Sequence, residues 1–263
     1  VAAAEEERFT RKKHDQSFPS HSIRYCLNEG KLTPADLDYV AFYDKPILKF
    51  ERILETTIAT FPKSLPPFLK AMPLWLKEKL WIPQKIHEEL GEKQKIIFLE
   101  HHLSHAASAF LVSPFAEAAI LTADGVGEWE TTTMGIGKEN SIKLTHSLSF
   151  PHSLGLFYSA FTYYLGFRVN SAEYKVMGLA PYGTPRFANL ILDELISLKE
   201  DGSFKLNMKY FAYDYGLTMT NRRFHNLFGA PPRQPESPLT QFHKDVAASI
   251  QYVTDTIMVK MAT

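Results

Sequence analysis

The sequence has little cysteine, no excess of either charge and no long apolar run. Cys26 is the one cysteine among 263 residues, which excludes an intramolecular disulfide and a cysteine-rich metal site and fits a reducing, cytoplasmic compartment. The 29 Lys and Arg residues balance the 29 Asp and Glu residues. Because phosphate contacts to duplex nucleic acid require an excess of Lys and Arg, nucleic acid is not expected as the main partner.

Membrane insertion and disorder are also excluded. The longest stretch without a charged residue, 144–167, is long enough for a span of about 20 residues, but His146, Pro151 and His152 interrupt it and the N-terminus carries no signal-peptide pattern. With 45% hydrophobic, 13% aromatic and only 22% charged residues, the chain is expected to form a compact core. Its length allows one large domain or two small ones.

Both ends of the sequence indicate incomplete elements. Residues 1–4 resemble the tail of an element whose start is absent. Near the other end, Ser237 and Pro238 have the features of an N-cap and a first helical position. Apolar residues then recur every three or four positions and the pattern still continues at Thr263. These residues are Phe242, Val246, Ile250, Val253, Ile257 and Met261. We expect a fragment that lacks its first strand and the elements beyond the long helix.

Between the ends, strands alternate with helices, which predicts an α/β fold with a mixed sheet. Strands are expected at 38–43, 95–99, 118–123, 131–136 and 142–150, and helices at 20–29, 49–60, 102–111, 154–165 and 185–198. Gly30 should close the first of these helices. A proline- and tryptophan-containing stretch at about 45–90 predicts a helical insertion, either packed on itself or offering a surface to a partner or substrate. Within it, 45–83 is where we expect an acceptor pocket.

His101 and His105 are the sharpest candidates for chemistry. They follow a short apolar strand and are four residues apart, so both lie on one face of the expected helix. This spacing suits two imidazoles on one metal ion, without the glutamate placement of hydrolytic zinc motifs. The alternative is that they are polar residues at a helix start.

The loop from Asp124 to Glu128 is the second candidate. It ends an apolar strand, and Gly125 and Gly127 would let backbone amides approach an anion, while Asp124 could bind a metal ion. A tight hairpin turn is the alternative. Because ligands collect at strand ends in α/β sheets, this loop and the histidines are expected to lie together.

Two further segments are weaker candidates for anion binding. Lys175 and Gly178, in an apolar and glycine-containing stretch, suit a nucleotide phosphate, with a surface lysine beside ordinary turns as the alternative. The charged run 5–15 could form a solvated hairpin or bind an anion through its basic residues. These are Arg8, Arg11, Lys12 and Lys13.

Four segments taken together resemble one family. EEERFTRKKHDQSFP, EHHLSHAASAF, DGVGE and the pair FPHSLGLFYSAFTYYLGF with EYKVMGLAPYG are similar, in this order, to the carbamoyltransferases of nodulation proteins and antibiotic O-carbamoylation. The resemblance covers nearly the whole chain. It implies a two-domain cytoplasmic enzyme whose N-terminal domain has the duplicated, ribonuclease-H-like fold of actin and sugar kinases. Residues 1–263 would be part of that domain.

The resemblance also implies substrates and cofactors. A YrdC-like C-terminal domain, with magnesium, would make carbamoyladenylate from carbamoyl phosphate and ATP, and the N-terminal domain would transfer the carbamoyl group to a hydroxylated small-molecule acceptor. His101, His105 and Asp124 would match the family's ligands for iron(II) or another divalent metal. Gly125, Gly127 and Glu128 would lie beside the nucleotide, with Lys175 and Gly178 as weaker matches.

The chain departs from the family pattern at both ends. The family's His-Asp pair near the acceptor hydroxyl would precede Val1, so no catalytic residue is assigned, and His14-Asp15 in the charged run is not that pair. A further metal-binding aspartate and the adenylate-forming domain would follow Thr263. We therefore expect the fragment to be inactive alone, with exposed apolar surface compatible with a homodimer. The alternative function is a nucleotide-binding module or phosphotransferase of the actin and sugar-kinase type, which would use magnesium at carboxylates.

Overall fold

The computed structural model describes residues 2–15 and 17–263, so part of the expected N-terminal tail, Val1, lies outside the described residues. The chain forms a mixed arrangement of α-helices and small β-sheets. The elements are the helices α1 (Glu7–Thr10), α2 (Ser20–Gly30), α3 (Pro46–Ala59), α4 (Leu65–Lys77), α5 (Ile82–Leu90), α6 (His101–Phe110), α7 (Leu154–Tyr164), α8 (Glu173–Leu179), α9 (Ala188–Glu194), α10 (Arg222–Phe228) and α11 (Gln241–Ala262); the strands β1 (Tyr39–Phe42), β2 (Lys95–Phe98), β3 (Glu117–Ala123), β4 (Glu130–Lys138), β5 (Ser141–Ser149), β6 (Ile196–Leu198) and β7 (Phe204–Leu206); and short 3₁₀ turns at Pro34–Asp36, Lys79–Trp81, Ala180–Tyr182 and Met208–Tyr210.

The described strands form three separate sheets. β1 and β2 are parallel, β3, β4 and β5 form an antiparallel meander, and β6 pairs antiparallel with β7. The expectation of one mixed sheet is therefore wrong within this part of the chain. Parallel and antiparallel pairing both occur, but β1 and β2 do not hydrogen-bond to the meander.

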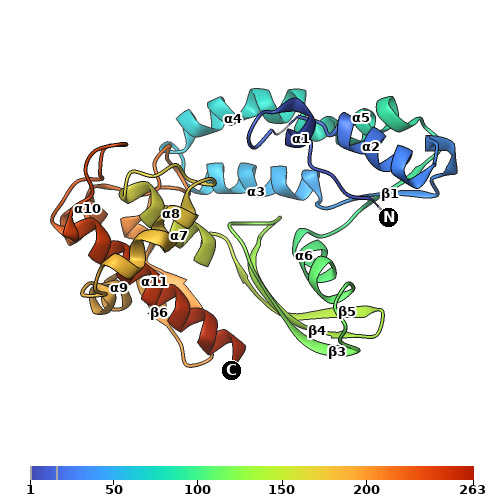
Figure 1. Cartoon of the computed structure of the whole chain (residues 1–263). Helices are drawn as coiled ribbons and strands as arrows, with labels where there is room; N and C mark the ends of the chain where they lie inside the picture. Colours follow the sequence, from blue (N-terminus) through green and yellow to red (C-terminus); the bar gives the residue numbers. More distant parts are fainter. Residues whose placement is uncertain (1, 16) are drawn as a thin grey trace.

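A lobe made by α7 to α11 contains the main hydrophobic core, on the side of the molecule marked by the C-terminus (Figure 1). The long helix α11 packs against α7, α8 and α9. Its repeating apolar face is buried as the spacing predicts, with Val246, Ile250, Val253 and Ile257 all fully buried. The aromatic rings of α7 and α10 interlock in this core, as in the edge-to-face pair of Phe161 and Phe224.

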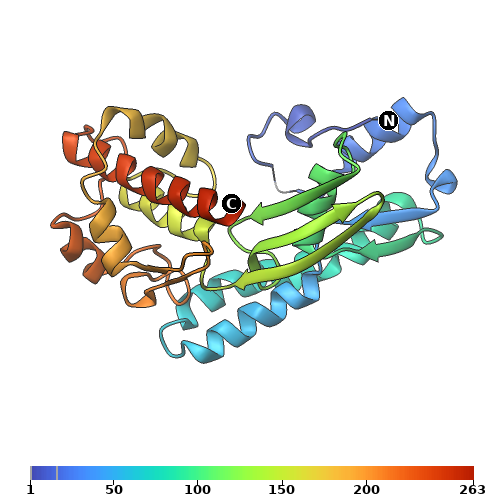
Figure 2. The same cartoon turned by 90° about the horizontal axis from the view of Figure 1, so that it is seen from below.

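The β3–β5 meander is curved and carries α6 on one face (Figures 1 and 2). A small apolar cluster of Ala106, Phe110 and Ile120 joins the helix to the sheet. This packing fixes the start of α6 beside the end of β3.

The helices α3 and α4 extend along another side of the molecule, from the C-terminal lobe toward α5 and the β1–β2 pair (Figure 1). The stretch 45–90 is helical as expected and contains α3, α4 and α5 between β1 and β2, whereas its role as an insertion stays a prediction. Neither α3 nor α4 has a buried residue in the described structure. Ile47, Ile58 and Leu69, for example, are 75%, 76% and 61% exposed.

Several expected boundaries differ from the structure. The last helix begins at Gln241 with Thr240 as its N-cap, because Thr240 and His243 form a reciprocal capping box that Ser237 does not offer. The helix expected at 185–198 is shorter and ends at Glu194, since the last residues pair as β6 with β7. The charged run 5–15 contains the one-turn helix α1 rather than a hairpin.

The end of α2 differs by one residue from the expectation. Gly30 is still helical, and Lys31 takes the left-handed conformation that follows the helix. The charge-free stretch 144–167 is divided between β5 and α7. No helix in the described part of the chain has both the length and the hydrophobicity needed to cross a bilayer.

Candidate metal centre

The candidate site lies where two strands end. β2 ends at Phe98 and α6 begins at His101, while β3 ends at Ala123 so that Asp124 follows directly. His105 is one helical turn beyond His101 and faces the same side. The structure therefore brings together the three residues that the sequence proposed as metal ligands.

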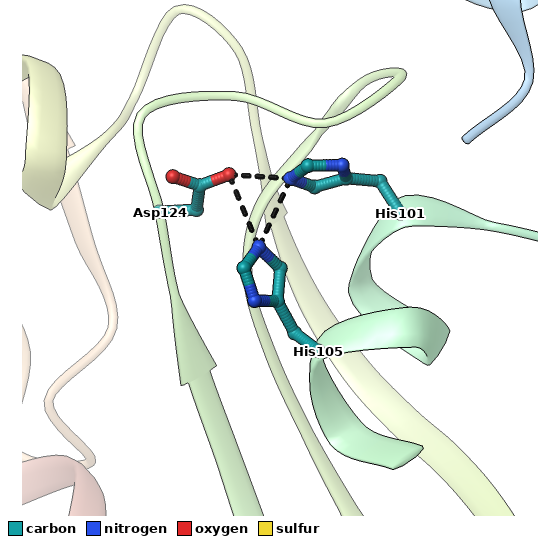
Figure 3. A group of neighbouring side chains, drawn as sticks. All are labelled: His101, His105 and Asp124. Carbon is teal, nitrogen blue, oxygen red and sulfur yellow. Dashed lines mark hydrogen bonds and ion pairs between the residues drawn. The ribbon is translucent and has the colours of Figure 1, made fainter. Parts of the chain in front are cut away.

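The three side chains converge on one point (Figure 3). Asp124 Oδ2 lies 2.6 Å from His101 Nε2 and 3.6 Å from His105 Nε2, and the two Nε2 atoms are 3.1 Å apart. Ligand atoms bound at 2.0–2.2 Å to one tetrahedral or octahedral metal ion are about 3–3.5 Å apart. The donor set suits a divalent metal ion. The His101–His105 separation lies within this range, whereas the 2.6 Å contact between His101 and Asp124 is a hydrogen bond whose atoms would move about 0.5 Å apart to share a metal ion.

The Asp124 carboxylate is ionised at neutral pH. Its hydrogen bond with His101 lowers the pKa of Asp124 well below the usual value, burial acts in the opposite direction, and the Gly125 N–H, which donates to Oδ1 at 2.6 Å, lowers it further. Two imidazoles and one carboxylate would thus present a single negative charge to a cation.

The outer faces of the two metal-facing histidines differ. His105 has a half-exposed side chain, whereas His101 Nδ1 is buried and has no hydrogen-bond partner among the described residues. A metal-bound histidine usually donates its other ring N–H to a neighbouring acceptor. The described part of the chain does not supply that acceptor for His101.

The neighbouring His102 points away from the cluster. Its Nδ1 lies 2.7 Å from Thr122 Oγ1 and its Nε2 lies 2.9 Å from the Glu130 carbonyl oxygen, and only 2% of the residue is exposed. Burial lowers the pKa of His102. The side chain therefore joins α6 to β3 and β4 in its neutral form.

Glu128 is buried behind the cluster and holds two helix starts. Its Oε1 accepts a hydrogen bond from the Lys45 N–H (2.9 Å) and its Oε2 accepts one from the His101 N–H (3.0 Å). These amides lie at the N-termini of α3 and α6, where a carboxylate satisfies unpaired donors and interacts favourably with the helix dipole. Both carboxylate oxygens of Glu128 thus accept hydrogen bonds from backbone amides of the chain. Its contact with a nucleotide stays a prediction.

Gly127 is required by the close approach of the loop to α6. A Cβ atom built at Gly127 would lie 3.0 Å from His101 Cβ and 3.1 Å from His102 Cδ2. A side chain there would require His101 and His102 to shift by a few tenths of an ångström. Its predicted role beside a nucleotide, and that of Gly125, stay untested.

Lys175 and Gly178 are not brought into the cluster. Both are exposed on α8, in the lobe with α11, and Lys175 Nζ lies 5.9 Å from the centre of the Phe167 ring (Figure 1). Of the predicted nucleotide-contacting residues, those in the Asp124–Glu128 loop thus adjoin the candidate metal centre, and those on α8 do not.

Ser153 was missed in the sequence although it ties the loop to the core. Its hydroxyl lies 2.6 Å from the Gly125 carbonyl oxygen and 3.0 Å from that of Asp124, and it accepts a hydrogen bond from the Leu156 N–H at the start of α7. Gly155 allows this approach, since a Cβ there would lie 2.7 Å from the Asp124 carbonyl. A serine directly before the apolar helix at 154–165 is an N-cap signal that could have identified it.

The fold and the site define a mixed α/β protein with a two-histidine, one-carboxylate cluster at strand ends. The family model of the carbamoyltransferase N-terminus matches residues 1–263, and the chain belongs to this family.

Comparison with curated proteins agrees. An uncharacterised protein of Synechocystis, sll1178, is 56% identical over 269 residues, covering 99% of this chain and 44% of the relative. The nodulation protein NolNO of Sinorhizobium fredii is 32% identical over 261 residues, covering 98% of this chain and 35% of the relative. NolO of Bradyrhizobium diazoefficiens is 32% identical over 160 residues, covering 61% of this chain and 27% of the relative. The chain thus spans less than half the length of these relatives.

Proposed function

We propose that this chain is the metal-bearing transfer domain of an ATP-dependent O-carbamoyltransferase. Membership of the family and the convergence of His101, His105 and Asp124 support this proposal, and the three-residue cluster is the observation that carries it. Two imidazoles and one carboxylate with open positions suit iron(II), and also suit zinc or manganese.

In the proposed reaction, carbamoyladenylate made from carbamoyl phosphate and ATP is the donor. A bond forms between the acceptor hydroxyl oxygen and the carbamoyl carbon, the bond from that carbon to the phosphate oxygen breaks, the hydroxyl proton is lost, and AMP leaves. A divalent cation at the cluster would supply positive charge beside the phosphate that departs.

The chain's own residues have a defined part in this proposal. Asp124, which also accepts a hydrogen bond from the Gly125 N–H, would bind the cation directly, together with the Nε2 atoms of both histidines. The hydrogen bond between His101 Nε2 and Asp124 would then be replaced by bonds to the cation. Glu128 fixes the backbone of His101, and Ser153 fixes the backbone of Asp124. The ligands therefore come from elements whose relative positions are set by buried hydrogen bonds.

Metal content is the first test. The purified chain, loaded anaerobically with iron(II), is expected to retain close to one equivalent by elemental analysis, and the His101→Ala and Asp124→Ala variants are expected to lose it. His146→Ala removes an exposed histidine on β5 and should retain the metal. Equal metal content in all four folded proteins would refute the site.

A second test addresses the reaction itself. A longer protein that contains this chain and an adenylate-forming domain should convert ATP, carbamoyl phosphate, water and a hydroxylated acceptor into AMP, pyrophosphate, inorganic phosphate and carbamoylated product. His101→Ala should lower the transfer step. A phosphorylated product formed with magnesium alone would instead identify a phosphotransferase of the sugar-kinase type.

A further inference from the structure

A cavity of about 310 Å³ lies between the insertion helices and the C-terminal lobe, away from the three proposed metal ligands. Its lining comes from α3 and α4, from the loop after β3, from the end of β5 and start of α7, and from the segment 213–219. Val126, two residues beyond Asp124, forms part of its wall. A molecule bound there would lie beside the loop that carries the metal-facing aspartate.

Most of the cavity wall is apolar or aromatic. The apolar and aromatic lining residues include Ile53, Phe68, Val126, Phe150 and Leu156. Two of the hydroxyl groups that also line it are already engaged. Thr57 Oγ1 donates to the Ile53 carbonyl oxygen at 2.7 Å, and Ser64 Oγ donates to the Thr57 carbonyl oxygen at 2.7 Å. Both hydroxyl groups already donate to backbone carbonyl oxygens, so neither is free to donate a hydrogen bond to a ligand.

Arg52 is a charged group without a partner at this cavity. Its guanidinium carbon lies 5.1 Å from the centre of the Phe150 ring, so the ring fixes one face of the group. Its Nε is buried without a hydrogen-bond partner, and the side chain makes no ion pair or hydrogen bond with any described residue. Burial lowers the pKa of Arg52 to about 10, with the charge of Glu128 acting in the opposite direction, so the group stays protonated at neutral pH.

Asp214 contributes a second unpaired polar atom to the same wall, and the charge of Lys63 lies near its carboxylate. Its Oδ1 is buried without a hydrogen-bond partner in the described structure, and no ion pair joins it to Arg52. Burial raises the pKa of Asp214. A buried polar group without a partner is unfavourable, and more so when it is charged. One cavity therefore offers an unmatched donor fork and an unmatched acceptor.

We propose that this cavity binds a small hydroxylated organic acid, whose oxyanion pairs with the Arg52 guanidinium, whose hydroxyl donates to the Asp214 carboxylate, and whose apolar body packs against Phe68 and Phe150. A guanidinium stacked on one face presents its N–H edge to a carboxylate or phosphate in two parallel hydrogen bonds. The cavity has the size of a small-molecule site. That this acid is the acceptor for carbamoyl transfer rests on the proposed function, whereas the binding site rests on the cavity alone.

Three related probes test the proposal on the full chain, kept free of metal with a chelator. 3-Phenyllactate carries the ring, the hydroxyl and the carboxylate; 3-phenylpropionate lacks the hydroxyl; and 3-phenyl-1,2-propanediol lacks the carboxylate. We expect 3-phenyllactate to bind in ligand-observed NMR titrations, and the diol to bind about tenfold or more weakly. Phenyl phosphate in place of the carboxylate separates a phosphate ligand from a carboxylate ligand, since the preferred probe identifies the oxyanion.

The variants separate the two polar contacts. Arg52→Met should weaken 3-phenyllactate binding about tenfold or more, and Arg52→Lys, which keeps the charge without the fork, should give an intermediate loss. Asp214→Asn should reduce the preference for 3-phenyllactate over 3-phenylpropionate. Arg222→Met, which removes an arginine outside the cavity, is the matched control and should bind normally. Circular dichroism establishes that each variant is folded.

Three results would overturn the proposal. The diol could bind wild type as tightly as 3-phenyllactate does, or folded Arg52→Met could bind 3-phenyllactate as tightly as wild type does. Finally, neither 3-phenyllactate nor phenyl phosphate could bind the folded wild-type chain at millimolar concentration. Because these titrations use metal-free protein, they are independent of the metal test. If the wild-type chain bound the acid but failed to bind metal, the proposed function alone would be refuted. If it bound metal but not the acid, the cavity proposal alone would be refuted.

Discussion

The two sides of the molecule differ in how they are stabilised. The main core is built entirely from residues between 154 and 257, where Phe157, Phe161 and Phe224 are fully buried. The helices α3 and α4 have no buried residue among those described, and Ile58 is 76% exposed. Because apolar burial is the main favourable contribution to folding, stability is concentrated in the C-terminal lobe.

The candidate metal centre lies between these two parts and is connected to each by one buried polar side chain. Ser153 joins the Asp124 loop to α7 in the C-terminal lobe, and Glu128 joins α6 to the start of α3. The backbone of Asp124 is therefore held by the packed core through Ser153. The backbone of His101 is held by Glu128, which also binds the start of α3.

The largest predicted effect removes an aromatic ring from the core. Phe161→Ala should lower the free energy of unfolding by about 3–5 kcal/mol, because the ring is fully buried and packs against Phe157, Phe224 and Phe228. Urea denaturation followed by circular dichroism measures the change. The same substitution at Phe115, which is 64% exposed, is the control and should cost less than about 1 kcal/mol. Similar losses at both positions would contradict the location of the core.

The sequence predicted these two parts unequally well. The apolar face of α11 and the apolar run of α7 were visible because a buried helix face repeats every three or four residues. The three candidate ligands were also predictable, since each directly follows a strand or lies one helical turn further on. The N-cap position of Ser153 was also readable, but its contact with the Asp124 loop and the contact of Glu128 with Lys45 were not, because these partners are backbone groups 29 and 83 residues away in the sequence.

The cavity at Arg52 shows a further limit of sequence reasoning. The insertion was expected to contain an acceptor pocket, but nothing in the local pattern distinguished Arg52 from other charged residues on an amphipathic helix. Its pairing with the Phe150 ring and its place in one cavity wall with Asp214 depend on tertiary packing alone. The expectation of an acceptor pocket in this segment stays a prediction, and the side chains that line the cavity are visible only in the structure.

A smaller effect is expected where the two parts meet. Glu128→Gln leaves one acceptor oxygen for two helix amides, so one of the Lys45 and His101 N–H groups loses its partner at a cost of about 1–3 kcal/mol. Hydrogen exchange should become faster in α3 and the first turn of α6, and remain unchanged in α7 and α11. Metal retention should also fall, because His101 is less well positioned.

Glu117→Gln provides the control for this change. It removes a carboxylate from an exposed ion pair with Lys138, which contributes little to stability. If Glu128→Gln raised exchange equally in α7 and α11, the two parts would form one cooperative unit and the comparison would be wrong.

Asp245 tests the polar part of the C-terminal core. Burial would raise its pKa, but hydrogen bonds from the Thr184 N–H and Gln241 and the nearby Arg186 outweigh burial, so the pKa is lowered. Asp245→Asn should cost about 1–2 kcal/mol at neutral pH. A lowered folded-state pKa stabilises the protein above the unfolded-state value of about 3.9, and this contribution is lost as the pH falls through the folded-state value.

The difference in unfolding free energy between wild type and Asp245→Asn should therefore be constant at neutral pH and shrink below about pH 4. Urea denaturation over this pH range measures it. A difference that grew on acidification would mean that the carboxylate is destabilising in the folded protein.

The smallest effect is expected on the exposed side. Ile58→Ser should change the free energy of unfolding by less than about 0.5 kcal/mol, since the side chain is already 76% exposed and little apolar surface returns to water on unfolding. Because Ile47, Leu69 and Ile58 leave apolar surface on α3 and α4, the same variant should be at least as monodisperse as wild type in sedimentation velocity. A loss above about 1 kcal/mol would show that this surface is covered in the folded chain in solution. In that case α3 and α4 would be stabilised by apolar burial as the C-terminal lobe is, but against a different packing partner.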